Sequence, residues 1–369
     1  MKLQQKHIVS DGLLNPAMVS RISRGVAPVV GDQSRVEGKN SLATAIIRVS
    51  SIIAGCTLLS LIALLLFRST SADSIEKPAP SIAPAAEVTG YKVESADELL
   101  ATLQGSNLWE IDKEVPAVVF ANLPADLEQL DVPTKKKAFL NTLLPISLIA
   151  VAEVAQEKKM LTEILAKLEH SGDTLLFDEE TVWPQGIKDE EIDILEHLCR
   201  KYRTTSKQML VNRVDVVPVS LILAQGALES SWGGSRFCRE GNNLFGVWTW
   251  GEEGMLPRER EDGESHKVAT YDSLLESVRA YLLMLNRLPA YADFRDLRKT
   301  GSASSLDLAD GLLYYSERRD SYVDDLKRLI VANGLQKFDG MELAADFQPA
   351  LPPETIKLVL LDAAKNASL

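Results

Sequence analysis

The chain has few of the side chains that most often bind metals. It holds three cysteines and four histidines. Neither set follows a zinc-binding spacing, because the residues are scattered along the chain. A glycine-rich phosphate-binding loop is also missing. We therefore expect no metal and no cofactor. Cys56 lies within a hydrophobic run, and the sequence leaves open whether Cys199 and Cys238 pair.

An excess of positive charge is lacking as well. The formal net charge is −12, so no basic face dominates the surface, which argues against nucleic acid as a partner. No internal repeat is present, which excludes a solenoid.

Charge is entirely absent from Val49 to Phe67, a run of nineteen residues between Arg48 and Arg68. About twenty apolar residues cross a bilayer as a helix, whereas a secretory signal has a shorter apolar region. The run predicts one transmembrane helix, with removal as a signal near Thr70 and Ala72 as the lesser alternative. Seven basic residues precede it against three acidic ones. The positive-inside rule therefore predicts a single-pass inner-membrane protein with its N-terminus in the cytoplasm and its main body in the periplasm.

The sequence divides into six predicted regions. They are a cytoplasmic head (1–48) with an unknown protein partner, the transmembrane helix (49–67), a Pro-rich tether (68–90), a short connecting region (91–113), the main domain (114–340) and a C-terminal tail (341–369). The fold of the apolar pieces between Tyr91 and Asp131 is not predicted.

Within the main domain, apolar residues recur mostly at helical spacing. Helices are predicted at 139–168, 190–202, 218–231, 274–288 and 322–332, and Ser273 with Glu276 predicts an N-terminal cap. The segment from Gly251 to Tyr271 breaks this pattern, and Asp262-Gly263 predicts a hairpin turn. The expected fold is mainly α with a small β lobe.

Glu229 is the first candidate catalytic residue, because it lies in the last turn of the otherwise apolar helix 218–231. Partial burial and the negative end of the helix dipole both favour its protonated form. A carboxyl group that keeps its proton near neutral pH suits a general acid in glycoside cleavage. The alternatives are an ion pair, for example with Arg236, or a solvent-exposed side chain.

Aromatic and amide side chains follow Glu229 closely. Flat rings stack against sugars, and amides bond N-acetyl or hydroxyl groups. The candidate substrate-binding residues are Trp232, Asn243, Phe245 and Trp248. Core packing is the alternative for the rings, most of all for Phe245, and a turn is the alternative for the amide of Asn243.

Four ordered motifs carry a family resemblance: ALESSWGGS, NNLFGVW, YDSLLESVRAYL and YYSERRDSYV. Together, over residues 114–337, they resemble the Bax-type glucosaminidase-domain proteins of glycoside hydrolase family 73. The resemblance implies a lysozyme-like glucosaminidase domain. It also implies cleavage of the β-1,4 bond between N-acetylglucosamine and N-acetylmuramic acid in peptidoglycan glycan strands.

The resemblance also assigns roles to particular residues. Glu229 matches the general acid of the family, and Tyr315 matches a tyrosine that shapes the groove. Glu259 is the nearest counterpart of the second carboxylate, with Glu261 as its substitute on the same strand face. Ser231 stands where many relatives carry glycine. Two alternatives stay open: a catalytically silent peptidoglycan-binding scaffold, and a muramidase or lytic transglycosylase on the same fold.

Overall fold

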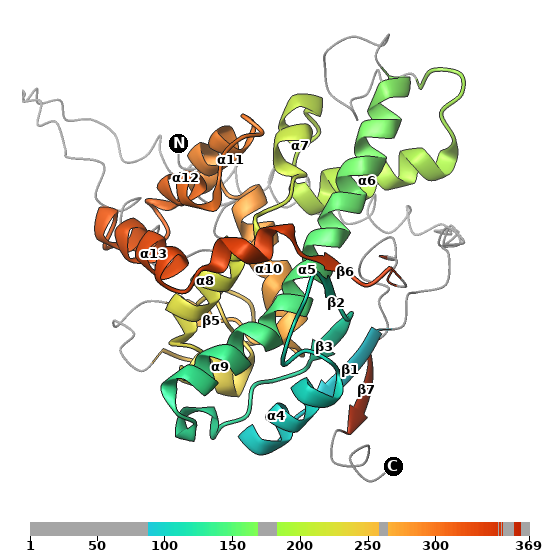
Figure 1. Cartoon of the computed structure of the whole chain (residues 1–369). Coiled ribbons are helices and arrows are strands. Elements are labelled where there is room, and N and C mark those ends of the chain that lie inside the picture. The colour runs from blue at the N-terminus through green and yellow to red at the C-terminus, as the bar shows by residue number, and fades with distance from the viewer. Residues whose placement is uncertain are drawn as a thin grey trace, which may run out of the picture. The chain divides into compact units, whose positions relative to one another are not determined.

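The computed structural model describes residues 88–168, 183–257, 265–345, 347, 349 and 358–362, which all fall in the unit of the chain that includes residues 82–369. The predicted membrane span, the head before it and most of the tether lie outside the described residues. Figure 1 shows a mostly helical structure. Its α-helices are α4 (Ala96–Gly105), α5 (Val132–Lys167), α6 (Asp189–Tyr202), α7 (Lys207–Arg213), α8 (Val219–Ser230), α9 (Arg236–Gly241), α10 (Leu274–Arg287), α11 (Ala292–Arg298), α12 (Ser305–Ala309) and α13 (Asp320–Ala332).

Short 3-10 helices and strands complete the described part. The 3-10 helices are η1 (Leu127–Gln129), η2 (Pro289–Tyr291), η3 (Asp310–Leu312) and η4 (Leu335–Gly340). The strands are β1 (Val88–Lys92), β2 (Glu114–Val115), β3 (Val118–Phe120), β4 (Trp248–Thr249), β5 (Lys267–Val268), β6 (Glu342–Leu343) and β7 (Leu358–Asp362). The expectation of a mainly α fold with few strands is confirmed.

Helix α8 lies at the centre of the hydrophobic core. Every residue from Val219 to Ala227 is buried, and the helix packs against α5, α13 and η4. Figure 1 shows α8 crossing beside the long helix α5. At its N-terminus, Asp339 of η4 accepts hydrogen bonds from the amide and the hydroxyl of Ser220, at 2.8 and 2.7 Å. The apolar sequence of α8 therefore follows from contact on all sides.

Helix α5 begins seven residues earlier than the predicted start at 139. Asp131 caps it by accepting a hydrogen bond from the Thr134 amide at 3.1 Å, and Pro133 stands in the first turn, where proline is tolerated. With this earlier start, Pro145 lies well inside the helix. Among the described residues α5 alone is long and apolar enough to cross a membrane, but 83% of its apolar window is buried. We therefore assign it to the protein core.

A parallel sheet joins segments that are distant in the sequence. β1 lies between β3 and β7, and β2 pairs with β6. Residues 88–90, predicted as the end of the tether, are thus part of β1. Residues in the predicted tail form β6 and β7. Helix α4, in the predicted connecting region, places Leu99 and Leu103 in the main core. The predicted boundaries therefore cut through segments that pack together.

The small β lobe consists of short antiparallel contacts. β4 pairs with β5, and a single bridge joins Met255 to Val268. This pairing agrees with the predicted hairpin, whose turn at Asp262-Gly263 lies outside the described residues. The cap of α10 is confirmed, since the Ser273 hydroxyl accepts a hydrogen bond from the Glu276 amide at 3.4 Å. Cys199 and Cys238 are both buried and free.

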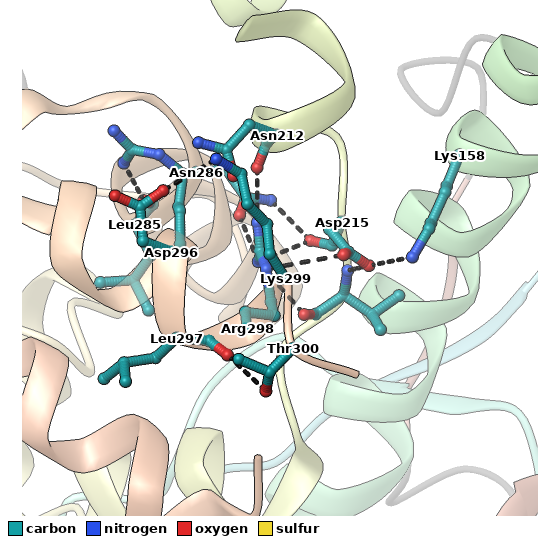
Figure 2. A network of polar contacts seen from close by, with 12 residues as sticks. Lys158, Asn212, Asp215, Leu285, Asn286, Asp296, Leu297, Arg298, Lys299 and Thr300 are labelled. Carbon is teal, nitrogen blue, oxygen red and sulfur yellow. Dashed lines mark hydrogen bonds and ion pairs between the residues drawn. The ribbon is translucent and has the colours of Figure 1, made fainter. Parts of the chain in front are cut away.

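A polar network holds the loop that leads into α8 (Figure 2). Arg298 donates to the carbonyls of Asp215 and Val216 at 3.0 and 3.1 Å, and to the Asn286 side chain at 2.7 Å. The Asp215 carboxylate in turn accepts from Lys158 of α5 at 2.6 Å. Carbonyl groups of a partly buried loop need such partners where water does not reach them. The network therefore fixes where α8 begins.

The close approach of η3 to α11 generates a first prediction. A Cβ atom on Gly311 would lie 2.3 Å from the Phe294 Cα, a backbone atom that cannot turn aside. We expect Gly311→Ala to lower the free energy of unfolding by about 3 kcal/mol. Gly105→Ala is the control, because its Cβ meets nothing within 4 Å and alanine favours the helix. Urea unfolding measures both, and equal stabilities of the two variants would contradict this packing.

Candidate active site

Glu229 lies in the last turn of α8, half-buried, as the sequence predicted. Burial raises the pKa of its carboxyl group from 4.5 to about 7, while a hydrogen bond from Tyr322 and the charge of Arg318 act in the opposite direction. The alternative of an ion pair with Arg236 is wrong, because that guanidinium contacts Glu240 at 3.3 Å and the Leu256 carbonyl at 2.8 Å. The carboxyl group of Glu229 can therefore hold a proton near neutral pH.

Four tyrosines from separate elements surround this carboxyl group. Burial raises the pKa of each of them, the negative charge of Glu229 adds to that rise, and all are at most 3% exposed. They are Tyr281 of α10, Tyr291 of η2, Tyr315 after η3 and Tyr322 of α13. Their rings exclude water and their hydroxyl groups supply local polarity. This combination favours a neutral acid that can still hydrogen-bond.

The chain turns sharply directly after Glu229. Ser231, Trp232 and Gly233 have φ angles of 53°, 59° and 83°, so three consecutive residues adopt the left-handed region. The Ser230 hydroxyl accepts from the Gly233 amide at 2.8 Å, and the Ser230 carbonyl accepts from the Ser235 amide at 2.8 Å. Glycine is best suited to such angles. The turn carries the chain away from the end of α8 and leaves the Glu229 side chain beside the following segment.

That following segment is organised by Asn243. Its amide nitrogen donates to the carbonyls of Val247 and Ala269, at 2.8 and 2.9 Å. Its oxygen accepts from the amides of Phe245 and Val247, at 3.3 and 3.0 Å. The side chain is 1% exposed. The expectation that Asn243 binds substrate is therefore corrected: its amide has no hydrogen-bonding capacity left, and it forms a turn.

The turn brings Gly246 next to the acid. A Cβ atom on Gly246, whose φ is +66°, would lie 4.0 Å from Glu229 Oε2. Phe245 is 1% exposed and stacks on Tyr281, with ring centroids 4.1 Å apart. Its carbonyl accepts a hydrogen bond from the Tyr315 hydroxyl at 2.8 Å. Phe245 is thus a core residue rather than a contact for sugar, and the Tyr315 hydroxyl holds the backbone of this segment. A role of Tyr315 in shaping the groove stays a prediction.

Three tryptophans stay partly exposed near these segments. Trp232 has Lys136 over its ring at 4.6 Å and packs edge-on against Phe139. Trp248 stacks on His266, with centroids 3.5 Å apart, and lies 6.3 Å from Trp250. Partly exposed rings remain able to stack on a sugar. Substrate binding by Trp232 and Trp248 stays a prediction.

Other expectations concern residues that the structure does not describe. Glu259 and Glu261 lie in 258–264, outside the described residues, so the second carboxylate stays a prediction. Within the described ranges, no group of three or more His, Cys, Asp or Glu side chains gathers as a metal site.

The sequence analysis did not identify Gln225 and Tyr322 as candidate site residues. Gln225 precedes Glu229 by one helical turn, and Tyr322 is the second-last residue of the motif YYSERRDSYV.

Comparison with known proteins identifies the domain that holds this site. The glucosaminidase family model, described as mannosyl-glycoprotein endo-beta-N-acetylglucosaminidase, matches residues 205–335. The chain is a glucosaminidase-domain protein. The domain includes Glu229 and all four surrounding tyrosines, while α5 and the parallel sheet lie outside the matched residues.

Relatives of this glucosaminidase-domain protein include a Bax protein, as the motifs indicated. Protein bax of Escherichia coli (strain K12) is 29% identical over 216 residues, which are 54% of this chain and 72% of that protein. Peptidoglycan hydrolase FlgJ of Salmonella typhimurium is 37% identical over 113 residues, 27% of this chain and 34% of that protein. The catalytic domain of the autolysin Auto from Listeria monocytogenes shows 23% identity and a TM-score of 0.29, covering 39% of this chain and 81% of that domain.

The left-handed turn generates a second prediction. Ser231→Gly should raise the free energy of unfolding by about 0.5 kcal/mol, because glycine relieves the positive φ but gains freedom in the unfolded chain. Ser230→Gly is the control and should destabilise, since its hydroxyl bonds the Gly226 carbonyl and the Gly233 amide. Urea unfolding tests the pair, and a destabilised Ser231→Gly variant would refute strain at this position.

The raised pKa of Glu229 generates a third prediction. Because the folded-state pKa of about 7 exceeds the ordinary glutamate pKa of 4.5, the contribution of Glu229 to stability is full below about pH 4.5 and is lost as pH rises through 7. Glu229→Gln cannot ionise. Its stability relative to the wild type should therefore increase by on the order of 3 kcal/mol between about pH 4.5 and 8. Unfolding curves at both pH values measure this, and a pH-independent difference would contradict the burial of a charge.

Proposed function

We propose that the chain is a membrane-anchored peptidoglycan hydrolase that cleaves the β-1,4 bond between N-acetylglucosamine and N-acetylmuramic acid. The observation that carries the proposal is the carboxyl group of Glu229, held among four tyrosines with a pKa of about 7. An enzyme that protonates a glycosidic oxygen at neutral pH needs such a group.

The proposed substrate is supported by the relatives. FlgJ is named a peptidoglycan hydrolase, although the chain spans only 34% of its length. The matched family model is named for an endo-beta-N-acetylglucosaminidase. Both names concern hydrolysis, and the second specifies the sugar. Residues 49–67 would anchor the domain to the inner membrane and place it in the periplasm, where glycan strands lie.

In the proposed mechanism, Glu229 donates its proton to the leaving oxygen while positive charge develops at the anomeric carbon. General acid catalysis of this kind contributes ~10²–10⁴-fold. Glu259, Glu261 or the acetamido group of the substrate stabilises the positive charge or guides water. Trp232 and Trp248 offer rings for stacking on sugars, and Tyr315 keeps the Phe245 carbonyl in place by its hydrogen bond.

The fourth prediction tests the acid. Glu229→Gln should lower the release of muropeptides from purified sacculi by at least about 100-fold, because the amide cannot donate the required proton. The wild-type rate should fall as pH rises through 7, since only the neutral carboxyl group donates. Glu240→Gln is the matched control: Glu240 is exposed, pairs with Arg236, and lies on the next helix.

Mass spectrometry of the products distinguishes the competing functions. New reducing ends on N-acetylglucosamine support the proposal. Reducing ends on N-acetylmuramic acid identify a muramidase, and anhydro products identify a lytic transglycosylase. Binding to sacculi without new ends identifies a scaffold. An unchanged rate in Glu229→Gln, with Glu240→Gln also unchanged, overturns the assignment of the acid.

A further inference from the structure

We propose that Gln225 and Tyr322 form a hydrogen-bond relay that fixes on which oxygen of Glu229 the catalytic proton resides. Both are positioning residues that act through Glu229. This inference rests on the proposed role of Glu229 as the general acid, and adds to it the group that orients the acid.

The relay begins at Tyr281 and passes through Gln225. Gln225 is 0% exposed and lies four residues before Glu229 on α8, so both side chains share one helix face. The Tyr281 hydroxyl donates to Gln225 Oε1 at 2.5 Å, and Gln225 Nε2 donates to the Tyr322 hydroxyl oxygen at 2.8 Å. An amide oxygen only accepts and an amide nitrogen only donates. The direction of both bonds is therefore fixed.

This direction leaves the single proton of Tyr322 available for Glu229. The hydroxyl oxygen of Tyr322 accepts from Gln225, and its hydrogen bond to the Glu229 carboxyl group lowers the pKa of that group. A carboxyl oxygen that accepts from Tyr322 cannot readily carry the acidic proton itself. The proton of neutral Glu229 therefore resides on the other oxygen. If the amide of Gln225 were reversed, Gln225 would accept the Tyr322 proton and Glu229 would lose this donor.

The hydrogen bond from Tyr322 to Glu229 strengthens when Glu229 releases its proton. A hydrogen bond to a carboxylate is stronger than one to a neutral carboxyl group. Tyr322 thus stabilises the charge that forms on Glu229 as the glycosidic bond breaks. Burial keeps the acid neutral before reaction, and the relay limits the cost of ionisation during reaction.

Few other groups in the described part of the chain act on this carboxyl group. Arg318, which precedes α13 and pairs with Asp325, lowers the pKa of Glu229 by its charge. Tyr291 and Tyr315 are coupled to it electrostatically. On η4, Asp339 binds Ser220 at the opposite end of α8. On α5, Glu153 pairs with Arg279.

The fifth prediction concerns Tyr322→Phe and Gln225→Met in the full chain. Tyr322→Phe removes the hydrogen-bond donor, so the pKa of Glu229 should rise by about one pH unit. The midpoint of the alkaline limb in the pH profile of kcat/KM should shift upward by the same amount. The value of kcat should fall about tenfold, with KM nearly unchanged. Gln225→Met should shift the limb in the same direction by less. In the Tyr322→Phe background, Gln225→Met should cause no further shift of the alkaline limb, because its effect passes through Tyr322.

Tyr271→Phe is the matched control, because the Tyr271 hydroxyl is buried and without a hydrogen-bond partner among the described residues, and Tyr271 is not one of the four tyrosines around Glu229. It should leave the alkaline limb within about 0.3 pH unit of the wild type. Infrared difference spectra against Glu229→Gln follow the carboxyl band directly, so the titration is measured even without turnover. Circular dichroism verifies folding, and Gln225→Met provides a second variant if Tyr322→Phe misfolds.

An unshifted carboxyl titration in folded Tyr322→Phe overturns the relay. Additive shifts in the double variant also overturn it. Failure of the proposed function gives a different result: Glu229→Gln would retain hydrolysis while the infrared titration still reported the relay.

Discussion

The site depends on keeping one carboxyl group uncharged at the end of a buried apolar helix. Water and the helix dipole act on Glu229 in opposite ways, since water favours the carboxylate and the negative end of α8 disfavours it. The surrounding rings of Tyr281, Tyr315 and Tyr322 shift this balance by excluding water, which raises the pKa to about 7. The rest of the fold serves to hold these rings around the last turn of α8.

The environment of Glu229 must remain polar enough to be stable. A buried hydroxyl or amide without a partner costs about 1–3 kcal/mol. Polar side chains buried around Glu229 without hydrogen bonds would therefore destabilise the folded protein. The hydroxyl of Tyr281 and the amide of Gln225 satisfy one another at 2.5 Å, and Tyr315 bonds the Phe245 carbonyl at 2.8 Å. Desolvation and hydrogen bonding therefore come from the same side chains.

The sequence predicts those features that depend on nearby residues. The limits of α8 and α10 follow from apolar spacing, a serine cap and the glycine pair after Trp232, which are all local signals. The sheet β3-β1-β7 was not predicted, because parallel pairing of Tyr91 with Leu361 leaves no local trace. The motif NNLFGVW marked Asn243 and Phe245 as candidate site residues, but it did not show whether their side chains face the substrate or the core. Only tertiary packing decides that both lie beneath the surface.

The segment that matches the family model is shorter than the segment that packs into one core. The family model matches residues 205–335, yet α8 within it is covered by α5 outside it. A Cβ atom on Gly226 would lie 2.7 Å from Leu143 Cδ2, so these two helices approach closely. The polar network also joins Asp215 inside the match to Lys158 outside it. Without α5, one face of α8 would be exposed to water, and the burial that raises the pKa of Glu229 would be reduced. The chemistry of the matched region therefore depends on the helix that precedes it.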